Sequence, residues 1–181
     1  MNKFKKNLIY NSNKVVINSK NISQGDIFIA LLGENNHGNS YIGQALNNGA
    51  KYILTDRQPK EKNYSKKIII VENILDFLLL IAKEKRNLFQ GKVVGVTGSV
   101  GKTSVKENLK YFLSPYYKIS ASIKSYNNYL GVIISLLNLD LKSKYAIFEL
   151  GTNNFSEIQN LTSIVNPNQI IITNIFPTHL E

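Results

Sequence analysis

The feature that most constrains the fold is a glycine-rich segment between an apolar run and a helical pattern. Residues 93–97 are nearly continuously apolar, and residues 103–113 carry apolar side chains at helical spacing. Residues 98–103 lie between them and read Gly-Ser-Val-Gly-Lys-Thr. After a strand, such a turn points backbone N–H groups at an anion, while Lys102 can neutralise phosphate and Thr103 can offer a hydroxyl to Mg²⁺. The segment predicts a phosphate-binding loop.

The loop departs from the general P-loop pattern at one position. That pattern has a glycine five residues before Gly101, where this chain has Val96. The succession of strand, turn and helix around Gly-Lys-Thr still favours nucleotide binding. The alternative is a glycine turn that only packs a helix on a strand, and it does not account for Lys102.

Strand and helix patterns alternate along the whole chain. We expect strands at residues 15–17, 27–31, 52–54, 68–71, 93–97, 119–121, 145–150 and 169–173. We expect helices at residues 41–48, from 74 to about 88 after a capping Asn73, at 103–113, at 131–139 and after Asn154. These patterns predict an α/β protein with a small mixed α/β domain at residues 1–89. A second, partial domain at residues 90–181 would hold a mostly parallel sheet with flanking helices.

Polar residues occur where the predicted strands of the second domain end. Glu149 lies near the end of one strand, and Asn174 and His179 follow another. Ligands of open parallel sheets bind outside the carboxyl ends of the strands. Because a buried carboxylate is costly unless it meets a cation, we interpret Glu149 as a Mg²⁺ ligand; the alternative is an exposed glutamate at the sheet edge. The position of His179 after a strand makes it a second candidate.

Composition excludes several classes of protein. The chain has no cysteine, so it has neither disulfides nor thiolate metal sites, and only His37 and His179 could supply imidazole. Its start lacks the apolar core of a signal peptide, and its longest apolar stretch, residues 77–82, is too short to cross a bilayer. We therefore expect a cytoplasmic protein without membrane insertion. The net charge is +10, but the lysines are spread along the chain, so we expect binding of small polyanions and no nucleic acid.

Four segments of the second half resemble the Mur ligase family, most closely its MurF branch. They are residues 97–107, 125–132, 149–158 and 173–181. The first reads Thr-Gly-x-x-Gly-Lys-Thr-Ser-x-Lys-Glu, and valine before its threonine is unremarkable in that family. The others resemble the family's Asn-Asn-x-x-Gly, Glu-x-Gly and Thr-Asn-x-x-Pro-x-His-Leu-Glu segments.

The first half resembles the same branch less strongly. Residues 17–20 are similar to its Asp-Ser-Arg uridine-site segment, and residues 25–31 to its Gly-Asp-Leu-Phe-x-Ala-Leu. Residues 37–41 are similar to Asp-Gly-His-x-Phe with the acid and the histidine replaced. The resemblance thus covers about residues 15–181 and implies a UDP-substrate-binding domain followed by part of a central ATP-binding domain.

The resemblance implies an ATP- and Mg²⁺-dependent ligase of peptidoglycan synthesis that joins D-alanyl-D-alanine to UDP-N-acetylmuramoyl-tripeptide through an acyl phosphate. The implied catalytic residues are Lys102, Glu149 and His179, and the implied Mg²⁺ ligands are Thr103, Glu149 and His179. The implied nucleotide contacts are Thr97, Gly98, Ser99, Val100, Gly101, Lys102, Thr103, Ser104 and Asn174. The implied substrate contacts are Ser19, Lys20, Asn127, Asn128 and Thr152. Full-length relatives are expected to be monomers.

Two alternatives stay open. One is another Mur-type ligase, such as a diaminopimelate- or lysine-adding enzyme or a cyanophycin-synthetase-like protein, although residues 177–181 lack the Asp-His usual there. The other is a non-catalytic nucleotide-binding module or a basic nucleic-acid binder. Because the sequence stops at Glu181, within the central domain, we hypothesise an incomplete ligase. It would bind nucleotide weakly at best, form no amide and leave an unpaired sheet edge.

Overall fold

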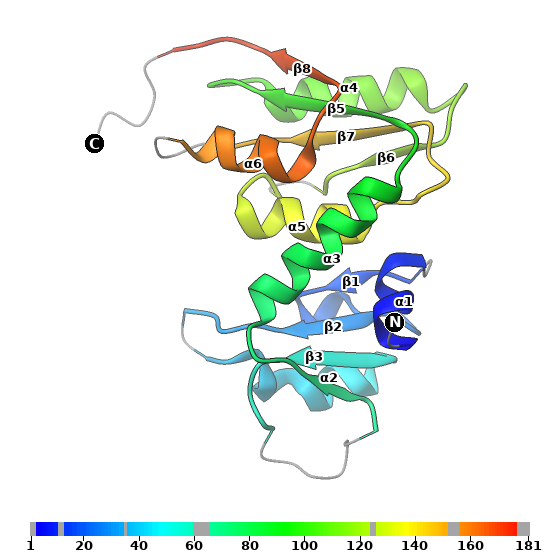
Figure 1. Cartoon of the computed structure of the whole chain (residues 1–181), viewed down its shortest axis with the longest axis vertical. Helices are drawn as coiled ribbons and strands as arrows, with labels where there is room; N and C mark the ends of the chain where they lie inside the picture. Colours follow the sequence, from blue (N-terminus) through cyan, green and yellow to red (C-terminus); the bar gives the residue numbers. More distant parts are fainter. Residues whose placement is uncertain are drawn as a thin grey trace. The chain divides into compact units, whose positions relative to one another are not determined.

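The chain forms two compact units, Met1–Leu78 and Leu79–Glu181, in a computed structural model (Figure 1). The structure describes residues 3–10, 13–34, 36–59, 66–123, 126–151 and 156–176. The long helix α3 (Ile74–Leu88) begins in the first unit and ends in the second. The predicted domain boundary after residue 89 lies just beyond this helix and stays a prediction.

The first unit is built on a four-stranded parallel sheet in the order β1-β2-β3-β4. Its elements are α1 (Lys3–Tyr10), β1 (Val15–Val16), the short 3₁₀ helix η1 (Ser19–Asn21), β2 (Ile27–Ala30), the 3₁₀ helix η2 (Gly38–Tyr41), α2 (Ile42–Asn47), β3 (Tyr52–Thr55) and β4 (Ile68–Ile70). All four residues of β2 are buried, as expected for a parallel strand covered on both faces. Ala45 of α2 packs with Phe28 and Ala30. The ring of Phe4 in α1 contacts that of Tyr52.

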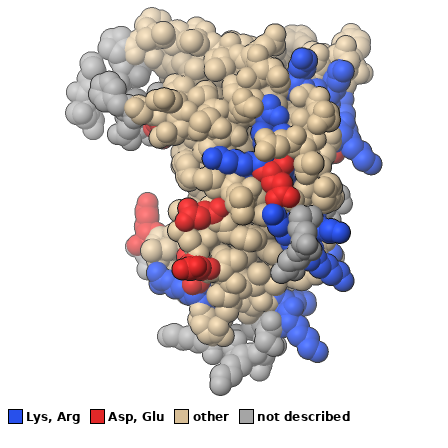
Figure 2. Space-filling view, in the orientation of Figure 1, with Lys and Arg blue, Asp and Glu red and all other residues tan. Residues whose placement is uncertain are grey.

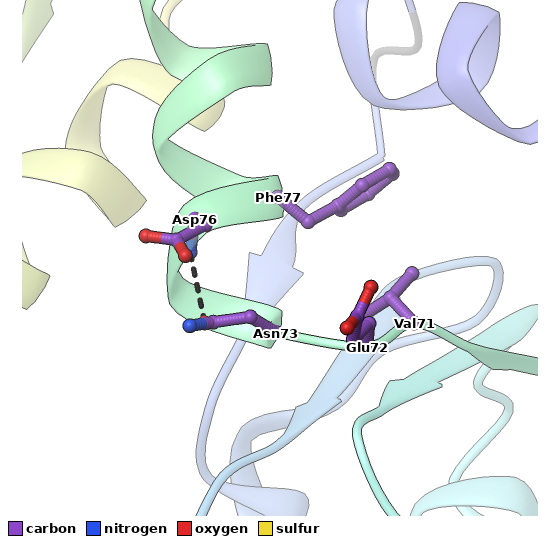
Figure 3. A pocket seen from close by; sticks show the side chains of 5 residues that line it. All are labelled: Val71, Glu72, Asn73, Asp76 and Phe77. Carbon is purple, nitrogen blue, oxygen red and sulfur yellow. Dashed lines mark hydrogen bonds between the residues drawn. The ribbon is translucent and has the colours of Figure 1, made fainter.

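Helix α3 begins where the sequence predicts it. The side-chain oxygen of Asn73 accepts hydrogen bonds from the N–H groups of Leu75 (3.0 Å) and Asp76 (3.1 Å), and Figure 3 shows the second of these. Two donors of the first helical turn are therefore satisfied within the chain. A surface hollow at this end of the helix is lined by Val71, Glu72, Asn73, Asp76 and Phe77 (Figure 3).

The second unit contains a parallel sheet in the order β6-β7-β5-β8. Its further elements are β5 (Lys92–Thr97), α4 (Lys102–Leu113), β6 (Ile119–Ala121), α5 (Tyr129–Leu137), β7 (Tyr145–Glu149), α6 (Glu157–Val165) and β8 (Gln169–Ile172). The chain moves in one direction across the sheet from β5 to β6 and in the opposite direction afterwards. Because such crossovers are right-handed, α4 covers one face, while α5 and α6 contact each other on the other face (Figure 1). The predicted α/β architecture with parallel sheets is confirmed.

The register between β5 and β7 determines on which face of the second sheet the side chain of Glu149 lies. Val94 and Val96 of β5 pack with Ile147 of β7 beneath α4. In the parallel pairing of the two strands, Val96 is the partner of Glu149. Partners in adjacent strands point to the same face, so the side chain of Glu149 also lies on the α4 side.

The last turn of α3 supplies cations to the ends of two helices in the second unit. Lys85 Nζ donates to the carbonyl oxygen of Leu137, the last residue of α5, at 2.6 Å. Arg86 donates to the carbonyl oxygens of Val165 and Asn166 at the end of α6, each at 2.6 Å. The final carbonyl groups of a helix lack partners within it, so both side chains satisfy acceptors that the helices themselves leave open.

Because Lys85 is buried, its contribution to the stability of the folded chain depends on pH. Desolvation lowers its pKa from 10.5 to about 8, although Asp140 acts in the opposite direction. Between these two values the unfolded chain binds more protons than the folded one, so the stability contributed by Lys85 is lowest below pH 8 and rises with pH through that window.

We therefore expect wild type to gain about 2 kcal/mol of unfolding free energy relative to Lys85→Met between about pH 7.5 and about pH 9.5. Urea denaturation of both proteins at the two pH values measures this difference, in which the titration of the other lysines and tyrosines cancels. A pH-independent difference would show that Lys85 keeps its ordinary pKa in the folded state.

The helices and the distribution of charge bear on two expectations from composition, the absence of membrane insertion and the absence of nucleic-acid binding. None of the helices in the described part of the chain is long and apolar enough to cross a membrane. On the face shown in Figure 2, Lys and Arg occur in several separate places with Asp and Glu between them. The absence of nucleic-acid binding stays a prediction.

β8 is an edge strand of its sheet, and Ile170 and Ile172 are exposed on it.

Candidate functional site

The predicted phosphate loop connects β5 to α4. Gly98 and Gly101 have φ angles of +132° and +82°, which L-amino acids rarely adopt. A Cβ atom on Gly101 would meet nothing within 4 Å, so this side of the loop is open. Because Gly101 precedes the first residue of α4 and carries no capping side chain, the N–H groups of the first turn are available to an external acceptor.

Lys102 lies over this loop. Its Nζ donates to the carbonyl oxygens of Gly98 (2.5 Å) and Ser99 (3.1 Å). The side chain thus bends back over the turn and does not extend into solvent. This arrangement places a full positive charge beside the N-terminus of α4, where a phosphate would be neutralised.

The segment after β8 holds the loop from the other side. Asn174 accepts from the N–H of Val100 (3.0 Å) and donates to its carbonyl oxygen (3.1 Å). The backbone oxygen of Asn174 accepts from Ser99 N–H at 3.1 Å. Ser99 Oγ also exchanges hydrogen bonds with the backbone of Phe176 (2.8 and 3.0 Å), and Thr173 Oγ1 donates to Val100 O (2.6 Å). Asn174, predicted to contact nucleotide, is here a brace of the phosphate loop.

Two predicted Mg²⁺ ligands lie in direct contact. Thr103 Oγ1 donates to Glu149 Oε2 at 2.9 Å, and Glu149 is only 3% exposed. A hydroxyl and a carboxylate that meet at one point form the oxygen donor set that Mg²⁺ prefers, so these residues fit the ion. Three or more His, Cys, Asp or Glu side chains do not gather anywhere among the described residues. The third predicted ligand, His179, lies outside them.

Lys106 is the residue of this cluster that sequence reasoning missed. It is fully buried, and its Nζ donates to Ser122 O at 2.9 Å and lies 3.2 Å from Glu107 Oε1 and 3.7 Å from Glu149 Oε2. In the sequence it counted only as part of a family pattern. Its spacing of three residues from Thr103 would have placed both on one helix face, and this was the available signal.

The predicted substrate residues have other partners. Asn127 Nδ2 donates to Glu149 Oε1 at 3.0 Å, whereas Asn128 caps α5 by accepting from Gly131 N–H at 2.9 Å. In the first unit, Ser19 Oγ donates to Gln44 at 2.5 Å, and Lys20 is exposed. Thr152 lies outside the described residues. Their roles toward a substrate stay predictions.

The remaining predicted nucleotide contacts divide into two kinds. Thr97 is buried, and its hydroxyl donates to Leu150 O at 2.9 Å, so it ties β5 to the end of β7. Val100 and Ser104 are exposed at the rim of the loop. Both kinds stay predictions as contacts to a ligand.

A glycine loop on a parallel strand, a lysine over it and a buried carboxylate at the next strand end define a nucleotide-binding α/β domain. Sequence comparison specifies the class. Residues 12–86 match the family described as "Mur ligase family, catalytic domain", and residues 96–181 match "Mur ligase middle domain". The chain belongs to the Mur ligase family, and its relatives place it with the MurF type.

Named relatives agree with this assignment. The UDP-N-acetylmuramoyl-tripeptide--D-alanyl-D-alanine ligase of Rickettsia prowazekii is 44% identical over 171 residues, which are 94% of this chain and 38% of that protein. The enzyme of the same name from Bacillus subtilis is 30% identical over 92% of this chain and 36% of its own length. The chain therefore spans less than two fifths of these relatives.

Solved structures give the same result. The crystal structure of MurF ligase from Thermotoga maritima in complex with ADP matches all of this chain and 40% of its own, with a TM-score of 0.76 and 31% identity. A crystal structure of MurF from Acinetobacter baumannii matches 92% of this chain and 36% of its own, with a TM-score of 0.74 and 31% identity.

Proposed function

We propose that this chain supplies the UDP-substrate-binding and ATP-binding parts of a ligase that joins D-alanyl-D-alanine to UDP-N-acetylmuramoyl-tripeptide. The observation that carries the proposal is the contact of Thr103 with the buried Glu149 beside the phosphate loop. The names of the relatives and the ADP complex of the Thermotoga maritima protein support it. Cytoplasmic location and a monomeric state remain predictions from the sequence.

In this proposal the loop binds the ATP phosphates. The first N–H groups of α4 face the phosphate oxygens, and Lys102 turns from the loop carbonyls to neutralise the β- and γ-phosphates. Thr103 and Glu149, together with His179, would hold Mg²⁺. When bound, the ion supplies positive charge against the phosphate oxygens.

The reaction would proceed in two displacements. The substrate carboxylate attacks the γ-phosphorus of ATP, which forms an acyl phosphate and releases ADP. The amine of D-alanyl-D-alanine then attacks the acyl carbon, loses a proton and displaces phosphate to form the amide. Lys102 and the N-terminus of α4 would act in the first displacement by holding the phosphates in line and compensating their charge.

The test is ADP binding to the 181-residue chain by titration calorimetry, with Mg²⁺ and with EDTA. We expect Mg²⁺ to strengthen ADP binding to wild type roughly tenfold, since a bound ion joins protein and phosphate oxygens. Glu149→Gln should lose most of this gain and keep its affinity in EDTA.

Glu107→Gln is the matched control, because Glu107 is a second carboxylate beside Lys106 but is 41% exposed in its side chain. It should keep the Mg²⁺ effect. An undiminished Mg²⁺ effect in Glu149→Gln would exclude Glu149 as a ligand, and absence of ADP binding to wild type would contradict the proposal for this chain.

A further inference from the structure

The buried lysine of α4 has no role in the function proposed above. Lys106 is completely buried, and its ammonium group lies between two carboxylates, at 3.2 Å from Glu107 and 3.7 Å from Glu149. A charged lysine is rarely buried unless it is paired, because removing its ammonium from water is costly. The charge of Lys106 must therefore be compensated by its neighbours.

The two carboxylates differ in burial, and this difference determines which of them interacts more strongly with Lys106. The side chain of Glu107 is 41% exposed and that of Glu149 only 4%, although Glu107 is the nearer of the two. Water compensates the charge of an exposed carboxylate, so the ion pair with Glu107 contributes little. Glu149 has no such compensation, and its electrostatic interaction with Lys106 is weakly screened.

The other contacts of Glu149 do not neutralise it. Thr103 and Asn127 each donate one hydrogen bond to its oxygens, but both are uncharged. Lys102, which could supply charge, has its Nζ on the carbonyl oxygens of the loop. The cation recorded within 4 Å of the Glu149 carboxylate is Lys106.

Ser122, which follows β6, fixes the geometry of the pair. Its carbonyl oxygen accepts from Lys106 Nζ at 2.9 Å, and its hydroxyl accepts from the backbone N–H of Glu149 at 3.1 Å. One buried residue thus holds both charged partners, which come from α4 and β7.

We propose that Lys106 is the internal counter-ion of Glu149. Its positive charge compensates the buried carboxylate and holds it in contact with Thr103 while no metal is bound, and a divalent cation at Glu149 and Thr103 can take over part of this compensation. Lys106 is then a positioning residue that contacts neither metal nor nucleotide. The part that concerns metal rests on the proposed function; the ion pair does not.

A double-mutant cycle in EDTA tests the pair. Thermal unfolding of the 181-residue chain is followed for wild type, Lys106→Met, Glu149→Gln and the double variant. Lys106→Met leaves a buried carboxylate uncompensated, so we expect its Tm to fall by roughly 10 °C. The double variant contains no buried charge at this place, so its Tm should fall by clearly less than the sum of the single falls. Additive falls would overturn the proposal.

Rescue by metal separates positioning from simple packing. Excess MgCl₂ should raise the Tm of Lys106→Met by several degrees more than that of wild type, because the ion replaces the missing positive charge, and it should not rescue the double variant. Coupling without rescue would support the counter-ion and refute Glu149 as a metal ligand. Rescue of the double variant to the same extent would overturn the proposal, since the ion would then act elsewhere.

Lys85→Met is the matched control. Lys85 is the other buried lysine of the described chain, and it also donates to a carbonyl oxygen, that of Leu137, at 2.6 Å. The fall in Tm caused by Lys85→Met should add to the fall caused by Glu149→Gln without coupling, and MgCl₂ should not reverse it. Coupling of the same size in this control would mean that the cycle reports general destabilisation, and the assignment of Lys106 would fail.

Discussion

Replacing Gly98 by alanine is expected to abolish ADP binding and to lower the Tm by roughly 10 °C. A Cβ atom there would lie 2.2 Å from Thr173 Oγ1 and 2.9 Å from the backbone oxygen of Asn174, and the φ angle of +132° is itself unfavourable for alanine. The Thr173 side chain could rotate, but the backbone of Asn174 cannot retreat without releasing the hydrogen bonds that hold the loop to the end of β8. Calorimetry and thermal unfolding measure the two effects.

Gly101→Ala is the control for Gly98→Ala. Its φ of +82° also disfavours alanine, but a Cβ atom there would have no atom within 4 Å. Only the backbone strain of about 1–2 kcal/mol remains, so the Tm should fall by a few degrees. Equal losses of stability in the two variants would contradict the close packing of Gly98 against the segment after β8.

Lys102→Ala is expected to weaken ATP binding roughly 100-fold and to leave the Tm nearly unchanged. A charge-assisted bond to phosphate contributes about 1.5–3 kcal/mol, which corresponds to roughly 10- to 150-fold in affinity, and we expect the loss to lie toward the upper end. In the absence of ligand, Lys102 contacts only carbonyl oxygens of its own loop among the bonds that the structure records, so its removal opens no core. Titration calorimetry with ATP and Mg²⁺ provides the affinity.

Lys110→Ala serves as the control for charge alone, because Lys110 lies on the same helix and is exposed. Its affinity for ATP should match that of wild type. If both variants bound ATP equally well, the phosphates would not lie at this loop.

Local pattern was sufficient for most secondary structure. The apolar runs of β5 and β7 and the start of α3 after Asn73 were predicted to within one or two residues, because burial on both faces and helix capping leave a direct signature in the sequence. Helix α1 was missed. It has few residues and many lysines, and it is held by the packing of Phe4, whose partners Tyr52 and Phe77 lie far away in the sequence.

The candidate site shows the same division. The sequence by itself determined the glycine loop, Lys102 and the donor types of Thr103 and Glu149, because loop conformation and metal preference depend on residue type and local order. Only the tertiary structure decided that Lys106 lies beside Glu149 and that Asn174 braces the loop. These contacts depend on the strand order β6-β7-β5-β8 and on its register, which are set by long-range pairing and burial that no local pattern records.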